Sequence, residues 1–181
     1  MKKLLLIIFT FIIASCSSIK VTYDYDKEAD FTRYKTYNFD KETLELPINQ
    51  LNRDRLLAAI DNEMTKKGFT KSDNPDVMVH VVAKVETQMQ ATANTTGSGM
   101  GYGYGRWGGY GYGGGFSTTT IDYNEYHDGT LFVSLIDITS EKIFWQGVAT
   151  KTLDENASAE KKEKNINYAM EQVFYKYPPG K

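Results

Sequence analysis

Two stretches of the chain repeat apolar residues at intervals of three and four, the spacing of a helix with one buried face. The first covers residues 52–67, and Gly68 follows it as a candidate left-handed cap. Its apolar residues are Leu56, Leu57, Ile60 and Met64. The second covers residues 158–177, with Ser158 as N-cap and Pro178 as its stop. Its apolar stripe consists of Ile166, Ala169, Met170, Val173, Phe174 and Tyr177. We therefore predict two amphipathic helices.

Other segments alternate apolar and polar residues, the pattern of a strand with one buried face. The clearest covers residues 76–87 and places Val77, Val79, Val81, Ala83 and Val85 on one face. The same pattern predicts strands at residues 21–25, 34–39, 118–126, 129–136 and 143–151. A loop is expected over residues 40–49, and a hairpin turn over residues 137–142.

The order of these elements indicates the fold class. Short strands, a helix, a strand, a long loop, three strands and a helix follow one another along the chain. This order predicts an α+β fold, with a mainly antiparallel sheet and two helices packed on one face. We expect one domain over residues 23–178, with a long glycine-rich loop inserted between two strands at about residues 91–116.

The loop has an unusual composition, because 11 of the chain's 15 glycines lie between Gly97 and Gly115. Two interpretations of it remain open. A glycine-rich tract loses much backbone entropy when it becomes ordered, which favours a solvated connector. Long loops in compact domains are also often functional, which favours an arm that contacts a polymer or a partner protein. The candidate contact residues are Tyr102, Tyr104, Arg106, Trp107, Tyr110 and Tyr112.

The N-terminus has the pattern of a secretory signal. Lys2 and Lys3 precede residues 4–14, which are apolar except for Thr10. Eleven helical residues extend about 16 Å, roughly half the hydrocarbon thickness of a bilayer, so this segment predicts a signal peptide rather than a membrane span.

The segment ends in Ile13-Ala14-Ser15-Cys16, which is similar to the lipobox of bacterial lipoproteins. We predict that residues 1–15 are removed, that Cys16 is lipidated, and that residues 16–22 form a tether. Two or three acyl chains hold a protein on a membrane stably. The alternative is a plain secretory signal with an incidental cysteine.

The residues after Cys16 bear on localisation. No aspartate follows Cys16 directly, which by the common sorting rule favours the outer membrane, and no acidic run typical of surface export follows it. We expect a lipid-anchored outer-membrane protein that faces the periplasm.

Charge and residue counts exclude several classes of protein. The formal net charge of −2 excludes a strongly basic nucleic-acid binder, and the tract around Arg106 lacks the repeated Arg-Gly-Gly units of RNA-binding segments. The single cysteine excludes an intramolecular disulfide framework and a zinc site built on several thiolates. No nucleic-acid partner is therefore predicted.

The sequence offers little for catalysis. His80 alternates with valines and is expected on a sheet face. The run Glu125-Tyr126-His127-Asp128 has metal-binding residue types, but strand neighbours point to opposite faces, so we interpret it as an exposed strand end before Gly129. The chain contains neither a Gly-x-Ser-x-Gly elbow nor a His-Glu-x-x-His motif. We predict no catalytic residue, no metal, no cofactor and no enzymatic activity.

Short blocks of residues follow one another along the chain, namely Asp24-Tyr25-Asp26, Asp30-Phe31, Tyr34-Lys35-Thr36-Tyr37, Ala59-Ile60-Asp61, Lys67-Gly68-Phe69, Asp76-Val77, Gly129-Thr130-Leu131, Asp137, Trp145-Gln146-Gly147 and Tyr177-Pro178-Pro179. In their order and spacing, these blocks resemble the domain-of-unknown-function family 4136 of bacterial envelope lipoproteins. The resemblance implies a lipid-anchored α+β domain without an assigned activity or catalytic residues. It also implies a glycine-rich insertion at this place in some members.

Two functional hypotheses follow. The leading one is a lipid-anchored envelope protein without enzymatic activity, a scaffold or accessory that contacts another envelope protein. The alternative is a binding module for cell-wall glycan or another surface polymer, acting through the glycine, tyrosine and tryptophan arm.

Overall fold

The computed structural model describes residues 19–97 and 117–179, which form six strands and three helices. Their order is β1 (Lys20–Tyr25), β2 (Thr36–Phe39), α1 (Lys41–Leu44), α2 (Gln50–Lys66), β3 (Thr70–Lys71), β4 (Val77–Gly97), β5 (Ser117–Asp137), β6 (Lys142–Thr152) and α3 (Ala159–Phe174). The strands form one sheet in the order β1-β6-β5-β4-β2-β3. The fold is α+β, as the sequence predicts.

The sheet is mixed. The β1–β6, β6–β5 and β5–β4 pairs are antiparallel, whereas β2 is parallel to both β4 and β3. The connection from β2 to β4 contains α1 and α2, and a connection of this kind permits a parallel crossover. The prediction of a mainly antiparallel sheet did not include these two parallel pairs. Alternation within a strand carries no information about the direction of the neighbouring strand.

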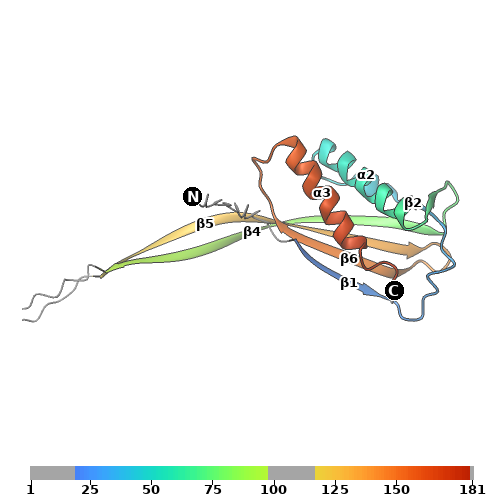
Figure 1. Cartoon of the computed structure of the whole chain (residues 1–181), viewed down its shortest axis with the longest axis horizontal. Coiled ribbons are helices and arrows are strands. Elements are labelled where there is room, and N and C mark those ends of the chain that lie inside the picture. Colours follow the sequence, from blue (N-terminus) through green and yellow to red (C-terminus); the bar gives the residue numbers. More distant parts are fainter. Residues whose placement is uncertain (1–18, 98–116, 180–181) are drawn as a thin grey trace, which may run out of the picture.

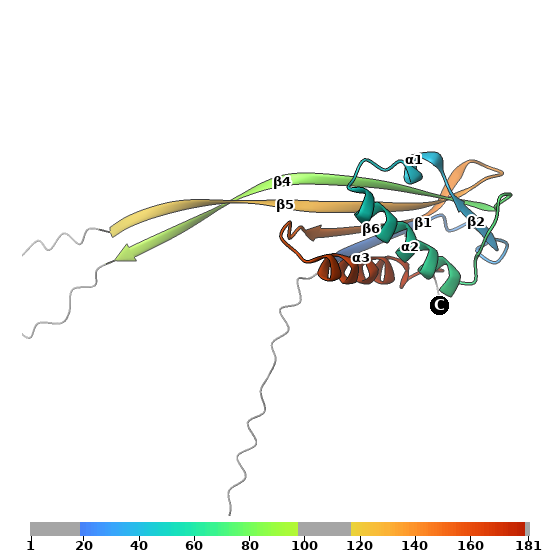
Figure 2. The ribbon, with the colours of Figure 1, turned by 90° about the horizontal axis from the view of Figure 1, so that it is seen from above.

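Helices α2 and α3 lie side by side over one face of the sheet (Figures 1 and 2). Ser158 caps α3 as predicted, since its side chain accepts a hydrogen bond from the backbone N of Lys161 at 3.2 Å. Gly68 follows α2 with a φ of +89°, also as predicted. The helix α3 ends at Phe174 rather than at Tyr177, because a residue that precedes a proline is disfavoured in helical conformation.

The core lies between this helix layer and the sheet. Its large side chains with less than 2% exposure are Tyr37, Ile60, Met64, Val77, Val79, Val81, Val133, Leu135, Trp145, Met170, Val173 and Phe174. The valines of β4 alternate as the sequence predicts, and the apolar stripes of both helices face them. The apolar residues that helix periodicity and strand alternation select are therefore buried together in one core.

The strands β4 and β5 are longer than the sequence indicated. Residues 91–97, predicted to belong to the loop, continue β4, and residues 118–126 and 129–136 form one strand rather than two. Gly129 lies within this strand, opposite Val85, and no turn precedes it. A Cβ at Gly129 would lie 2.8 Å from Cδ2 of Leu153. The glycine therefore permits close packing of Leu153 on the strand.

A short helix, α1, occupies part of the loop predicted over residues 40–49. The buried Thr43 hydroxyl accepts a hydrogen bond from the backbone N of Val81 at 2.7 Å and donates one to the carbonyl oxygen of Val79 at 3.4 Å. The side chain of Thr43 thus forms hydrogen bonds with the backbone of β4 at the point where the pairing of β4 with β2 ends.

Candidate functional site

The most distinctive feature of the structure is a long two-stranded extension of the sheet (Figure 1). Beyond the Thr87–His127 pair, β4 and β5 continue through ten more residue pairs to Gly97 and Ser117. We call residues 88–97 and 117–126 the β4–β5 ribbon. Ten residues of antiparallel strand extend about 34 Å. The ribbon therefore projects well beyond the helices that cover the rest of the sheet (Figure 2).

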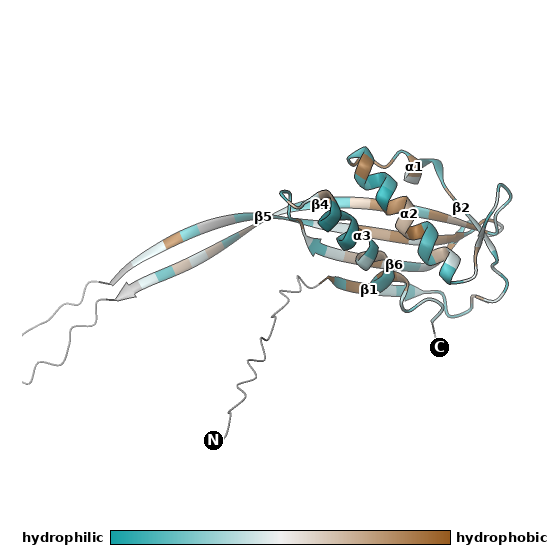
Figure 3. Ribbon diagram, turned by 45° about the horizontal axis from the view of Figure 1, so that its top comes forward, coloured by the Kyte–Doolittle hydropathy of each residue, from teal (hydrophilic) through white to brown (hydrophobic). Residues whose placement is uncertain are grey.

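Hydrophobic and hydrophilic residues follow one another along the strands of the ribbon (Figure 3), and successive residues of a strand point to opposite faces. One face continues the side of the sheet that the helices cover, and it carries the apolar Met89, Ala91, Ala93 and Ile121 together with the polar Glu125, Thr95 and Thr119. Met89 is 75% exposed and Ile121 is 53% exposed. The other face carries polar side chains, namely Gln88, Gln90, Thr92, Asn94, Thr120, Asp122 and Tyr126. The ribbon is thus amphipathic, with apolar side chains in contact with solvent.

Polar contacts across the ribbon join its two strands. The Asn94 amide donates a hydrogen bond to Asp122 at 3.2 Å, and the hydroxyls of Thr95 and Thr119 lie 3.3 Å apart. No bulge interrupts the pairing of β4 with β5. These pairs fix the register that places Gly97 opposite Ser117.

The predicted contact residues Tyr102, Tyr104, Arg106, Trp107, Tyr110 and Tyr112 lie outside the described residues. The strand register shows only where the segment that contains them is attached. The tract 98–116 joins two strand ends that are paired neighbours at the far end of the ribbon. Cys16 also lies outside the described residues, so its lipidation stays a prediction.

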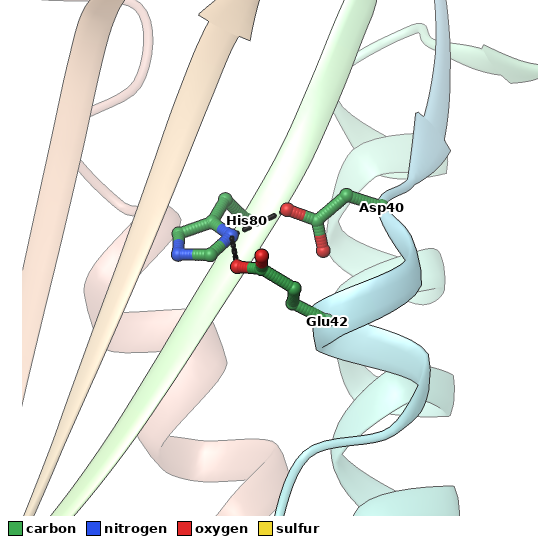
Figure 4. A group of neighbouring side chains, drawn as sticks. All are labelled: Asp40, Glu42 and His80. Atoms are coloured by element: carbon green, nitrogen blue, oxygen red, sulfur yellow. Dashed lines mark hydrogen bonds and ion pairs between the residues drawn. The ribbon is translucent and has the colours of Figure 1, made fainter.

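A second group of polar side chains surrounds His80, which lies on β4 (Figure 4). Its Nδ1 contacts Oδ2 of Asp40 and lies 3.8 Å from Oε2 of Glu42. Asp40 also caps α1, because its Oδ1 accepts a hydrogen bond from the backbone N of Thr43 at 2.7 Å. The prediction of His80 on a sheet face is consistent with its place on β4, but both carboxylates were missed, because they come from a separate element that only the parallel β2–β4 pairing brings next to His80.

The chemistry of this group is that of a carboxylate–histidine pair. Burial alone would raise the pKa of Asp40, but hydrogen bonds from Thr43 and His80 hold it below its usual value. One ligand atom from each of Asp40, Glu42 and His80 lies within 4.8 Å of the others, and such a set suits a divalent transition metal. However, the helix cap and the His80 contact already account for Asp40, and the Glu42 side chain is 82% exposed.

The residues around His127 do not converge on one point. Thr87 Oγ1 lies 3.1 Å from Nδ1 of His127, and Glu155 lies 3.5 Å from its Nε2. Asp128 instead accepts a hydrogen bond from the Thr152 hydroxyl at 2.8 Å. Within the described ranges, these residues do not form a group with metal-ligand spacing.

An apolar groove of about 410 Å³ lies beside the base of the ribbon. Ile48, Leu56, Leu131, Leu153 and Ile166 contribute to its lining, and Ile19 lies at one side of it. Ile19 is the third residue after Cys16.

Across residues 19–97 and 117–179, no helix has both the length and the hydropathy needed to cross a membrane.

Two solved bacterial structures are similar to this chain. A PDZ domain protein from Parabacteroides distasonis has a TM-score of 0.54 and 16% sequence identity; the match covers 90% of this chain but 37% of that protein. The PelC dodecamer from Paraburkholderia phytofirmans has a TM-score of 0.48 and 9% identity, with 87% of this chain and 95% of PelC covered. At these identities the likeness to the first shows the fold alone.

Comparison of sequences gives a more definite result. No curated protein shows a detectable match to the chain. By contrast, the model of a domain of unknown function, DUF4136, matches residues 21–179, which is most of the chain. The protein therefore belongs to the DUF4136 family.

Proposed function

We propose that the protein is a lipid-anchored scaffold or accessory of the bacterial envelope, without enzymatic activity, whose β4–β5 ribbon contacts a partner. The observation that carries this proposal is the ribbon itself. Its side chains are exposed on both faces wherever they are described, apart from the half-buried Tyr126, so they add little to the core.

The ribbon is costly to order. Fixing the backbone of one residue opposes folding by about 1–2 kcal/mol, and core burial normally offsets this term. The ribbon replaces that burial with cross-strand hydrogen bonds and keeps apolar side chains such as Met89 in solvent. Elements that project from a rigid body frequently carry binding function. A contact surface is therefore the best-supported role for the ribbon.

The start of β1 supports an anchor close to the body. Only Ser17 and Ser18 separate Cys16 from Ile19, and a stretch of three residues reaches about 10 Å. Lys20 pairs with Thr150 on β6, near the base of the ribbon. A lipid on Cys16 would thus hold the body next to the membrane, while the ribbon extends about 34 Å from its base.

The anchor is tested by lipid labelling in a bacterial host. Cells that express the full chain and receive a labelled fatty-acid precursor are expected to label the unchanged protein, whereas the Cys16→Ala variant should carry no label. The removed thiol is the acceptor of the lipid, so the loss should be complete. Labelled protein in the Cys16→Ala variant would refute the anchor at this residue.

A second candidate function places recognition in the tract 98–116. The observation that favours it is the register, which attaches this aromatic-rich tract to the far end of the ribbon. In this case the protein is a binding module for cell-wall glycan or another surface polymer. The aromatic residues then supply stacking surfaces for the polymer.

Replacing residues 98–116 with a short Gly/Ser linker is expected to leave the melting temperature unchanged or slightly raised. Loop-closure entropy changes by only about 0.6 kcal/mol for each doubling of loop length. A large fall in melting temperature would show that the tract supports the fold.

The same variant separates the two functions. Retention on isolated cell-wall polymer should fall if the tract is a binding arm, and changing Trp107 with Tyr102, Tyr104, Tyr110 and Tyr112 to serine should reproduce the loss. Unchanged capture of envelope proteins by both variants would instead support a scaffold that acts through the ribbon.

A further inference from the structure

Both long edges of the β4–β5 ribbon are open in the part of the chain that the structure describes. Strand β6 pairs with β5 only as far as Asp128, and β2 pairs with β4 only at residues 77–79. Each ribbon strand therefore presents a row of unpaired backbone N–H and C=O groups, which can pair with a further strand. A two-stranded sheet is marginally stable in water, and a third strand stabilises it.

The edge formed by β4 lacks the features that usually prevent such pairing. Residues 87–95 contain neither a charged residue nor a proline, and β4 pairs with β5 without a bulge. The outer edges of the main sheet differ from it. Strand β3 has two residues, and β1 has six residues that include Lys20 and Asp24. The ribbon edge of β4 is thus both long and unprotected.

We propose that residues 87–95 of β4 pair antiparallel with the same residues of a second copy of this chain, about a two-fold axis at Ala91. A register centred on Ala91 uses all nine uncharged residues. It sets Met89 opposite Ala93 of the other copy, so a large side chain meets a small one. The product is a four-stranded sheet in the order β5-β4-β4-β5.

The occupant is a second copy because the edge is complementary to itself. In a two-fold pairing the same segment of both copies forms the interface, so that residue 89 of each copy contacts residue 93 of the other. Two-fold dimers are the commonest homo-oligomers. Pairing through β5 is less favourable, because it would bring Asp122 and Glu125 of both copies into one strand pair. The inference names the partner of the ribbon and does not require lipidation of Cys16.

The register is tested by crosslinking at the proposed axis. The full chain with Ala91→Cys, expressed in the bacterial envelope, is expected to give a dimer when treated with a short bis-maleimide. The two Cβ atoms at position 91 should lie about 5 Å apart. Ile121→Cys is the matched control on the same face of the ribbon. In this sheet its two copies are separated by three strand spacings, at least about 14 Å, and should remain monomeric.

The unsubstituted chain, treated in the same way, gives the background from Cys16. Equal crosslinking of the Ala91→Cys and Ile121→Cys variants, or none from either, would overturn the proposal. An adduct of Ala91→Cys with a different protein would overturn the second copy as the occupant of this edge.

A charge exchange provides a test that depends on the register. Because position 90 of one copy faces position 92 of the other, Gln90→Lys with Thr92→Lys places like charges opposite each other twice and should make the detergent-solubilised chain monomeric in sedimentation. Gln90→Glu with Thr92→Lys places opposite charges there and should restore the dimer. The control puts both lysines on β5, at Thr120 and Asp122, and should remain dimeric. A monomeric unsubstituted chain, or equal masses for all three variants, would overturn the proposal.

Discussion

Replacing Phe174 with alanine is expected to lower the free energy of unfolding by about 3–5 kcal/mol. Phe174 is fully buried, and its ring stacks on the buried Trp145 with 5.3 Å between ring centroids. The change would leave a cavity between α3 and the sheet, where partial relaxation cannot recover the lost contacts. Because domains of this size are stable by roughly 5–15 kcal/mol, the variant should be close to unfolding.

The surroundings of Phe174 leave little room for repacking. A Cβ at Gly147 on β6 would lie 2.5 Å from Cγ1 of Val173 and 2.6 Å from a ring carbon of Trp145. The helix α3 therefore rests directly on the backbone of β6. Denaturant unfolding followed by circular dichroism measures the loss, and Tyr175→Ala, at the neighbouring 69% exposed position, is the control. Equal stability of the Phe174→Ala and Tyr175→Ala variants would show that α3 does not dock through Phe174.

The helices and the core of the sheet could be predicted from the sequence because their signals are local. The stripe that includes Met170 and Val173 specifies one helix face, and the alternation of Val77, Val79 and Val81 specifies one strand face. Both sets are fully or almost fully buried. In each case burial of apolar residues and the period of the backbone point to the same structure.

Only part of the ribbon could be predicted in this way. Alternation predicts a strand over residues 118–126, whereas the β4 half was missed because residues 90–95 are polar or small on both faces. The run Ala91-Thr92-Ala93-Asn94-Thr95 has no apolar alternation that separates a strand from a loop. What orders it is pairing with residues about 30 positions away, as in Ala93 opposite Ile121. The strand end predicted before Gly129 was wrong for a related reason. The glycine is required there by the close packing of Leu153, a residue distant in sequence, and not by a turn.

The group around His80 was missed because its parts come from separate elements. Asp40 and Glu42 reach His80 only because β2 lies parallel to β4 and α1 begins directly after it. No spacing within the sequence encodes that neighbourhood. The one local feature that could have indicated the start of α1 is Asp40, a residue type favoured at helix N-caps. Its side chain accepts a hydrogen bond from the backbone N of Thr43.

Asp137→Ala is expected to cost about 1–3 kcal/mol of stability, because it leaves the buried Tyr34 hydroxyl without its acceptor, whereas the side chain of Arg33 is 52% exposed and can be solvated. One oxygen of Asp137 accepts hydrogen bonds from Arg33 at 2.7 Å and from the Tyr34 hydroxyl at 2.8 Å. The other accepts from the backbone N of Thr139 at 2.7 Å and of Ser140 at 3.1 Å. This carboxylate thus joins the segment before β2 to the turn between β5 and β6.

The pH dependence distinguishes the charge of Asp137 from its shape. Burial alone would raise the pKa of Asp137, but hydrogen bonds from Tyr34, Ser140 and Thr139 hold it below the ordinary value of about 4. The folded state then binds this proton less readily than the unfolded state. The stabilisation is therefore fully present above the unfolded pKa and is lost as the pH falls through the lower folded pKa. Burial and the bond to Asp137 also raise the pKa of Tyr34 to about 12, so Tyr34 remains a donor in this range.

Urea unfolding of the unchanged chain and of Asp137→Asn between about pH 7 and pH 2 tests this account. The asparagine keeps the size of the side chain but cannot titrate, so the gap in stability between the two proteins should be largest at neutral pH and should narrow as the solution becomes acidic. The control is Asp154→Asn, which removes an exposed carboxylate 2.7 Å from Lys161 and should leave stability nearly unchanged at every pH, because solvent screens this pair. If the gap for Asp137→Asn stayed constant across the range, Asp137 would act through packing alone, and its charge would not link β2 to the β5–β6 turn.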